Sequence, residues 1–178
     1  KNLTKASYWE SRDNNETDKL VDSNFDSMFS KREGVTTREE ALEREHTERE
    51  ECAEAYQAIK DLRYDLSEQL FRPLAEQGNR LAMLDLARLH LRDLVSLPDL
   101  TYARGLLDSL ARLGDASANK ELGDIFSVGL GVTQDYKKSF EYYQTAAKQG
   151  DVEAMADVGY AYLNGLGVNK NVGSAMHW

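Results

Sequence analysis

The feature that most constrains the fold is a repeat of 36 residues that covers the C-terminal half of the chain. Gly78, Gly114 and Gly150 are spaced 36 residues apart, and each ends a similar string, LAEQG, LARLG or AAKQG. The strings FSVGLGV at 126–132 and YLNGLGV at 162–168 lie in the same register, again 36 residues apart. A fixed period of this length is typical of solenoids, in which each repeat packs only against its neighbours.

The residues within each repeat predict a pair of helices. From about residue 38 onward the apolar residues follow a helical period, and the alternating pattern of strands is missing. We expect Gly129 and Gly165 to end the first helix of a pair in the left-handed conformation, and Asp135 and Asn171 to cap the second helix. A phosphate-binding role for the GLGV strings is disfavoured, because no strand precedes them and neither GxGxxG nor Gly-Lys-Ser/Thr occurs. Gly123 and Gly159 lie inside the predicted first helices. We expect each of them to allow the second helix of its pair to approach closely.

A resemblance to the sel-1-like repeat family, relatives of tetratricopeptide repeats, is carried by ANKELGDIFSVGLGVTQDYKKSFEYYQTAAKQG and AMADVGYAYLNGLGVNKNVGSAMHW. It is good over residues 79–178, although HLRDLVSLPDL replaces the glycine loop in the first unit, and weak over 66–78. There we expect Pro73 to kink or break a helix. The resemblance implies an all-α protein, with an α-α solenoid of about three helix-turn-helix repeats over residues 65–178 that is incomplete at its C-terminus.

Residues 37–64 are predicted to form one long charged helix that precedes the solenoid. Thr37 opens a Thr-Arg-Glu-Glu string, the signature of a capping box. Between residues 38 and 54 there are three Arg and eight Glu, which we interpret as a solvated face, with an acidic docking surface as the alternative. Cys52, the only cysteine, begins an apolar stripe with Tyr56 and Ile59, so we expect a buried core residue rather than a reactive thiol.

The two ends of the chain give further expectations. Residues 1–36 are polar and are predicted to form a partly disordered arm; the alternative is an arm that lays Trp9 or the Phe25–Phe29 pair against a groove. At the other end, Trp178 lies about two turns into a helix. We expect a longer parent protein, or an end covered by a partner or by a second copy of the chain.

The sequence offers little support for an enzyme or for binding of nucleic acid. His46, His90 and His177 fall in three different predicted elements without metal-ligand spacing, and no nucleophile elbow occurs, so we expect no catalytic residues, no metal and no cofactor. The net charge of −9 repels phosphate backbones. No apolar run reaches the 18 residues that a membrane span needs, so we expect no membrane insertion.

The resemblance implies a scaffold or adaptor that binds another protein or peptide on a concave face lined by the first helices. Carried over in the 36-residue register, this places six partner-binding residues: Arg88, Arg92, Lys120, Asp124, Tyr160 and Asn164. We predict that an acidic or carboxylate-terminated peptide docks near Arg88 and Arg92; alternatively, these arginines only solvate a helix face. Two other functions stay open, an immunity or inhibitor protein that blocks an enzyme, and a regulatory domain of a larger enzyme. Family analogy favours the periplasm or the secretory pathway.

Overall fold

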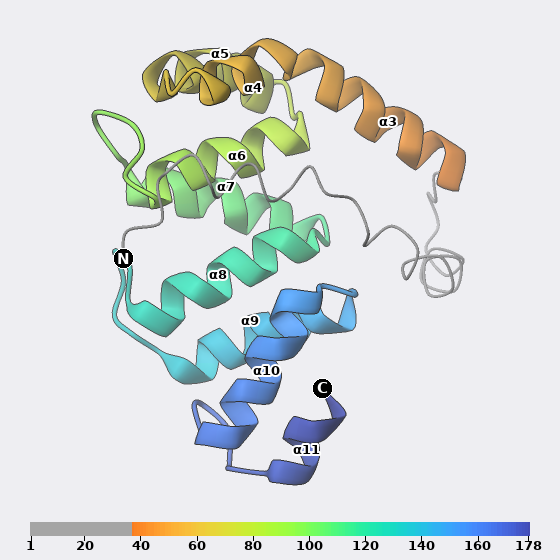
Figure 1. Cartoon of the computed structure of the whole chain (residues 1–178), viewed down its shortest axis with the longest axis vertical. Helices are drawn as coiled ribbons and strands as arrows, with labels where there is room; N and C mark the ends of the chain where they lie inside the picture. Colours follow the sequence, from red (N-terminus) through yellow and green to blue (C-terminus); the bar gives the residue numbers. More distant parts are fainter. Residues whose placement is uncertain (1–36) are drawn as a thin grey trace.

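The computed structural model describes residues 37–178, in which α-helix is the regular secondary structure. These residues form nine α-helices and no strand, and the helices stack one after another along the long axis of the molecule (Figure 1). Most helix–helix contacts join elements that follow one another in the chain, as expected for a solenoid. The prediction of an α-α solenoid is confirmed. The helices are α3 (Arg38–Glu51), α4 (Ala53–Lys60), α5 (Tyr64–Glu76), α6 (Arg80–Leu91), α7 (Leu100–Arg112), α8 (Ala116–Val128), α9 (Tyr136–Lys148), α10 (Val152–Asn164) and α11 (Val172–His177).

Three helix pairs, α6–α7, α8–α9 and α10–α11, make up the repeats, and the loops of α8–α9 and α10–α11 share one geometry. Asp135 and Asn171 cap the second helices as predicted, each with a side-chain oxygen that accepts backbone N–H groups of the first turn. The backbone N–H of Asp135 donates to the Phe126 carbonyl, and that of Asn171 donates to the Tyr162 carbonyl, both at 2.9 Å. The same hydrogen bond therefore closes both loops, 36 residues apart.

The loop of the first repeat lacks the glycines but keeps the same closure by another route. Asp99, 36 residues before Asp135, caps α7. Its backbone N–H donates to the ring nitrogen Nδ1 of His90 at 3.0 Å, where the other repeats use a backbone carbonyl. The buried imidazole of His90 thus replaces a main-chain acceptor. The degenerate loop still ends at Asp99, the position that corresponds to Asp135 in the next repeat.

The glycines of the repeat serve helix ends and close packing. Gly129 and Gly165 end α8 and α10 in the left-handed conformation, with φ of 76° and 73°, as predicted. A side chain at Gly167 would overlap the backbone carbonyl at the start of α9 in the preceding repeat. A Cβ at Gly123 would lie 2.5 Å from the Tyr143 ring, which confirms the expected close approach of the second helix.

The segment before the repeats differs from the prediction of one long charged helix. The capping box at Thr37 is present, because Thr37 and Glu40 exchange hydrogen bonds between side chain and backbone. The helix is interrupted at Cys52, however, and divides into α3 and α4. The Asn79 side chain contacts the chain at this break: its amide donates to the Glu48 carbonyl at 3.1 Å and its oxygen accepts from the Cys52 thiol at 3.7 Å. These contacts tie the end of α3 to the start of α6.

Pro73, at which we expected a kink or a break, does not break its helix. Helix α5 runs from Tyr64 to Glu76 and continues through Pro73. Pro73 is exposed, and so is Gln69, whose carbonyl loses its helical N–H partner and can face water instead. The α4–α5 pair packs against α6 and extends the stack of helices ahead of the first repeat (Figure 1).

Cys52 is a core residue, as the sequence predicted. Its side chain is fully buried with Phe71 and Leu86, and burial is the main cause that raises the pKa of the thiol to about 12. Most of α3 is exposed, in accord with a solvated charged face, apart from Glu48, which is buried. The arm predicted over residues 1–36, with Trp9 and the Phe25–Phe29 pair, lies outside the described residues.

Candidate functional site

The first helices of the three repeats present a face with one carboxylate at each equivalent position. We call this surface, formed by α6, α8 and α10, the first-helix face. Asp85, Glu121 and Asp157 are spaced 36 residues apart and lie on these three helices in turn. The charged groups around these carboxylates differ from repeat to repeat, and the candidate site lies where they differ.

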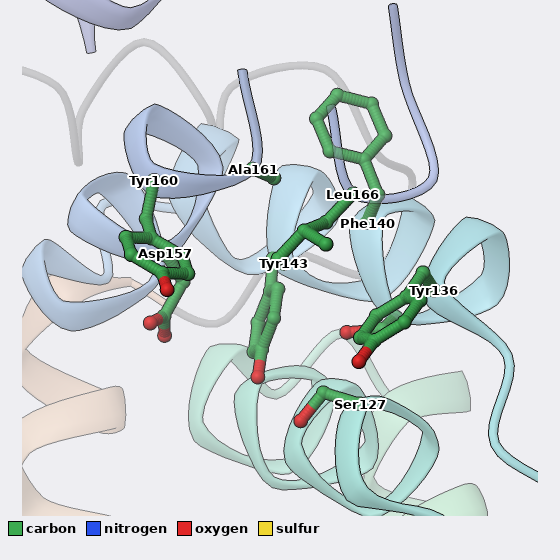
Figure 2. A pocket seen from close by; sticks show the side chains of 9 residues that line it. Ser127, Tyr136, Phe140, Tyr143, Asp157, Tyr160, Ala161 and Leu166 are labelled. Atoms are coloured by element: carbon green, nitrogen blue, oxygen red, sulfur yellow. The ribbon is translucent and has the colours of Figure 1, made fainter. Parts of the chain in front are cut away.

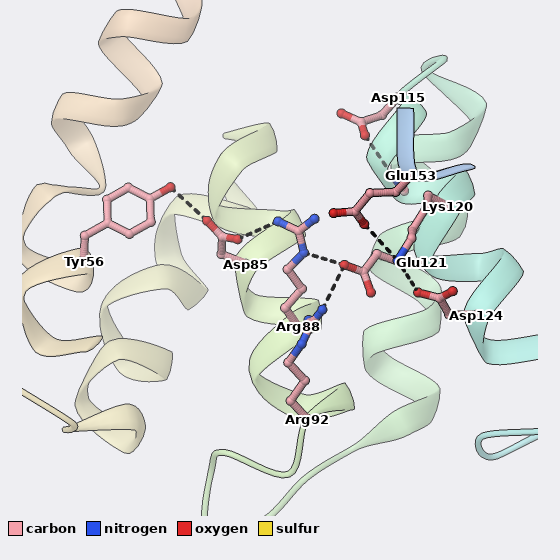
Figure 3. Close-up of polar contacts among 10 residues, drawn as sticks. Tyr56, Asp85, Arg88, Arg92, Asp115, Lys120, Glu121, Asp124 and Glu153 are labelled. Carbon is pink, nitrogen blue, oxygen red and sulfur yellow. Dashed lines mark hydrogen bonds and ion pairs between the residues drawn. The ribbon is translucent and has the colours of Figure 1, made fainter. Parts of the chain in front are cut away.

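The first two carboxylates share one arginine. Arg88 Nε lies 2.6 Å from Glu121 Oε1, and Arg88 Nη1 lies 3.1 Å from Asp85 Oδ1 (Figure 3). Asp85 also accepts a hydrogen bond from the Tyr56 hydroxyl at 2.9 Å, and Arg92 Nη2 lies 3.4 Å from Glu121. The side chains of Arg88, Asp85 and Glu121 are 7%, 5% and 6% exposed. This buried network joins α4, α6 and α8.

The network keeps Glu121 ionised. Burial by itself raises the pKa of this carboxyl group, but the positive charges of Arg88 and Arg92 outweigh it and lower the pKa below its usual value. The alternative interpretation of Arg88, that it solvates a helix face, is wrong, because its guanidinium lies between two carboxylates inside the structure. A role of Arg88 and Arg92 in binding a partner stays a prediction.

Lys120 links the second repeat to the third. Its Nζ lies 2.9 Å from Asp124 Oδ2 within α8 and 3.2 Å from Glu153 Oε2 on α10 (Figure 3). Burial lowers the pKa of Lys120, but its carboxylate neighbours outweigh this effect and the pKa is raised. Lys120 is therefore charged, and two carboxylates already surround it.

A pocket of about 310 Å³ opens between α8, α9 and α10. Figure 2 shows tyrosine rings and the Asp157 carboxylate around it. Tyr136 and Tyr160 are 40% and 61% exposed at its rim, whereas Tyr143 is buried and donates from its hydroxyl to Asp124 Oδ1 at 2.8 Å. The pocket is lined by Ser127, Tyr136, Ser139, Phe140, Tyr143, Asp157, Tyr160, Ala161 and Leu166.

Asp157 is the carboxylate of this pocket that lacks a counter-ion. It is partly buried, and within residues 37–178 its side chain makes no hydrogen bond or ion pair. Burial raises its pKa, the charges of Asp124 and Glu153 raise it further, and Lys120 lowers it. The pocket thus combines aromatic surface with negative charge that the described part of the chain leaves uncompensated.

The structure brings the predicted residues together in two groups and adds others. Arg88 and Arg92 meet on Glu121, and Lys120 meets Asp124, whereas Tyr160 lines the pocket one repeat further along. Asn164 is exposed one turn beyond Tyr160, where its amide donates to the Tyr160 carbonyl at 2.9 Å, and it does not line the pocket. Of the six predicted site residues only Tyr160 lines the pocket, and its tyrosines Tyr136 and Tyr143 and its carboxylate Asp157 were missed from the sequence. Only Asp157 carried a signal, the 36-residue register.

The described helices give no sign of a metal centre or of a membrane span. No group of three or more His, Cys, Asp or Glu side chains in residues 37–178 is arranged to hold a metal ion. Within the same residues, no helix combines the length and the apolar character needed to cross a bilayer.

Comparison with known proteins places the repeats in a family. The family model described as Sel1 repeat matches residues 80–115, 116–151 and 152–178. Human protein sel-1 homolog 2 is 32% identical over 109 residues, which are 61% of this chain and 16% of the relative, and the mouse protein is similar to the same extent. The chain thus spans only about a sixth of the length of these relatives.

Solved structures agree with this assignment. A Sel1 repeat protein from Oxalobacter formigenes is 26% identical, with a TM-score of 0.59 over 62% of this chain and 84% of that one. A protective antigen of uropathogenic Escherichia coli strains, which displays an SLR fold, is 31% identical, with a TM-score of 0.60 over 65% of this chain and 25% of that one. Sel1 repeats are generally protein-interaction repeats, and this chain belongs to the Sel1 repeat family.

Proposed function

We propose that the chain is a non-enzymatic scaffold or adaptor that binds a partner protein on the first-helix face, at the pocket between α8, α9 and α10. The observation that carries the proposal is this pocket, in which exposed tyrosine rings lie beside a carboxylate without a counter-ion. Tyrosine is enriched where proteins bind one another, because it adds a large contact area at a low cost in conformational entropy.

The structure determines which variants can test this proposal. Arg88→Glu would place a third carboxylate beside Asp85 and Glu121 in the buried network, so a lost partner would reflect unfolding as readily as lost contact. Tyr160 is 61% exposed, and its truncation removes contact area without opening the core. Asn164→Ala probes the same face one turn beyond the pocket.

The test is affinity capture with the chain as bait, followed by mass spectrometry, with wild type, Tyr160→Ala and Asn164→Ala run in parallel. Leu113→Ala is the matched control, because Leu113 is 66% exposed and lies outside the first helices. We expect a partner that Tyr160→Ala loses and Leu113→Ala retains. A partner that both Tyr160→Ala and Leu113→Ala retain would place binding elsewhere and contradict the proposal.

We also propose self-association through the C-terminal face, because two apolar side chains of α11 are exposed there. Val172 and Met176 are 54% and 84% exposed. Analytical ultracentrifugation of wild type and Met176→Glu tests this, with Leu97→Glu as the control, since Leu97 is equally exposed at 85% in the loop before α7. A dimer that only Met176→Glu dissociates supports the proposal; a monomer at all concentrations contradicts it.

A further inference from the structure

The repeat register shows what is missing at Asp157. Arg88 lies three residues after Asp85 and reaches across to Glu121, the equivalent carboxylate of the next repeat. The residue that corresponds to Arg88 one repeat later is Asp124. Asp124 therefore occupies the position from which an arginine side chain would reach Asp157. Its side chain is shorter than that of arginine and has the opposite charge. This exchange leaves space beside Asp157 and removes its counter-ion.

The charges around the pocket favour a cation as the occupant. Lys120 is the one positive side chain that lies among Asp124, Glu153 and Asp157 in the described structure, and it is already shared by Asp124 and Glu153. Counted together, these three carboxylates exceed Lys120 by two charges. A cation that binds here meets complementary charge, whereas an acidic group meets repulsion.

The shape and chemistry of the lining favour a guanidinium. The exposed rings of Tyr136 and Tyr160 flank the pocket, and the Tyr143 ring forms part of its wall (Figure 2). A guanidinium is planar and stacks on aromatic faces, while its fork of donors matches a carboxylate. At about 310 Å³ the pocket lies at the small end of ligand sites, which suits one side chain rather than a large ligand.

We infer that the pocket accepts an arginine side chain from a basic segment of the partner protein, which pairs with Asp157 as Arg88 pairs with Glu121 inside the chain. The inference rests on the proposed function and adds the chemistry of the partner to it. In this arrangement the partner supplies from outside the cation that the first two repeats supply from within.

The experiment selects random heptapeptides displayed on phage against the full chain. Wild type and Asp157→Asn are used in parallel, and Glu141→Gln on the exposed side of α9 serves as a control with the same change in charge. We expect arginine to be enriched at one position on wild type and on Glu141→Gln, and this enrichment to fall at least fivefold on Asp157→Asn. Circular dichroism checks that all three chains are equally folded.

The best peptide is then synthesised with arginine and with citrulline, its neutral analogue. We expect citrulline to weaken binding to wild type about tenfold and binding to Asp157→Asn less than twofold. If Tyr160→Ala abolishes binding of the selected peptides but these peptides show no arginine enrichment, the inference is overturned and the proposed function still stands. Peptides insensitive to both Tyr160→Ala and Asp157→Asn, or no enriched peptide at all, would overturn both.

Discussion

The substitution Arg88→Met tests the buried network that joins the first two repeats. Methionine keeps the aliphatic volume of the arginine stem but leaves Asp85 and Glu121 without the guanidinium between them. Removing one partner of a buried ion pair costs about 3–5 kcal/mol, because the remaining charge stays buried without compensation. Here Glu121 retains Arg92 at 3.4 Å and Asp85 retains the Tyr56 hydroxyl at 2.9 Å, so we expect the lower end, about 3 kcal/mol.

The assay is urea unfolding at pH 7, followed by circular dichroism at 222 nm, with a thermal scan beside it. For a chain of this size, 3 kcal/mol corresponds to a fall in Tm of roughly 6–12 °C. The double variant Arg88→Met/Glu121→Leu removes the guanidinium and one of its two carboxylates, so it should recover part of the loss, while Asp85 stays buried without its counter-ion. Arg49→Met is the control, because its ion pair with Glu45 lies in solvent, where such pairs contribute little.

Two results would refute this reasoning. One is a single variant whose free energy of unfolding stays within about 0.5 kcal/mol of wild type, the range of ordinary surface substitutions. The other is a double variant no more stable than Arg88→Met. A pH series adds a third check: Glu121 has a lowered pKa in the fold, so the stability from this pair is present above the unfolded value near 4.5 and is lost as the pH falls through the folded value.

Substitutions at His90 and Gly167 and chemical modification of Cys52 test three further features of the structure. Burial lowers the pKa of His90, so the contribution of this residue to stability is complete above the unfolded pKa near 6.5 and decreases as the pH falls below it. In urea titrations, wild type should therefore lose more stability between pH 7 and pH 5 than His90→Asn. The asparagine amide oxygen can still accept the hydrogen bond from the Asp99 N–H. Gly167→Ala should lower Tm more than Gly150→Ala, because both glycines have positive φ but only Gly167 has a backbone carbonyl in the way of a new Cβ; equal losses would contradict the packing role. The thiol of Cys52 should react with Ellman's reagent only in denaturant, since burial keeps it protonated and covered; rapid reaction of the native chain would contradict this.

The helix boundaries were predictable wherever the repeat register fixed them. A glycine that must be left-handed and an aspartate that must cap recur every 36 residues, so local chemistry placed the ends of α8, α9 and α10. The same register would have found Asp99 as the cap of α7, although the surrounding string is degenerate. The repeated loop residues say nothing about Cys52 and Pro73. There the helix break lies beside Asn79, the residue that caps α6, and the helix continues through a proline exposed to water.

The candidate site was predictable only as far as the register reached. It correctly placed Arg88, Asp124 and Tyr160 on successive first helices, because residues 36 apart occupy the same face. It could not show that Arg88 extends across to Glu121, since the reach of a side chain between helices depends on their separation and angle. Tyr143 was out of reach for the same reason: it lies on a second helix and enters the pocket because Gly123 allows α9 to approach α8 so closely.

The three equivalent carboxylates show that one repeat position can carry a compensated carboxylate in one place and an uncompensated one in another. Asp85 and Glu121 are compensated because the residue one turn later in the first repeat is Arg88. In the second repeat that residue is Asp124, which holds Lys120 and the Tyr143 hydroxyl and so leaves Asp157 facing the pocket. The backbone register is the same in both repeats. An uncompensated carboxylate in a pocket can therefore arise in this fold by exchange of a single side chain one turn after the equivalent carboxylate of the preceding repeat.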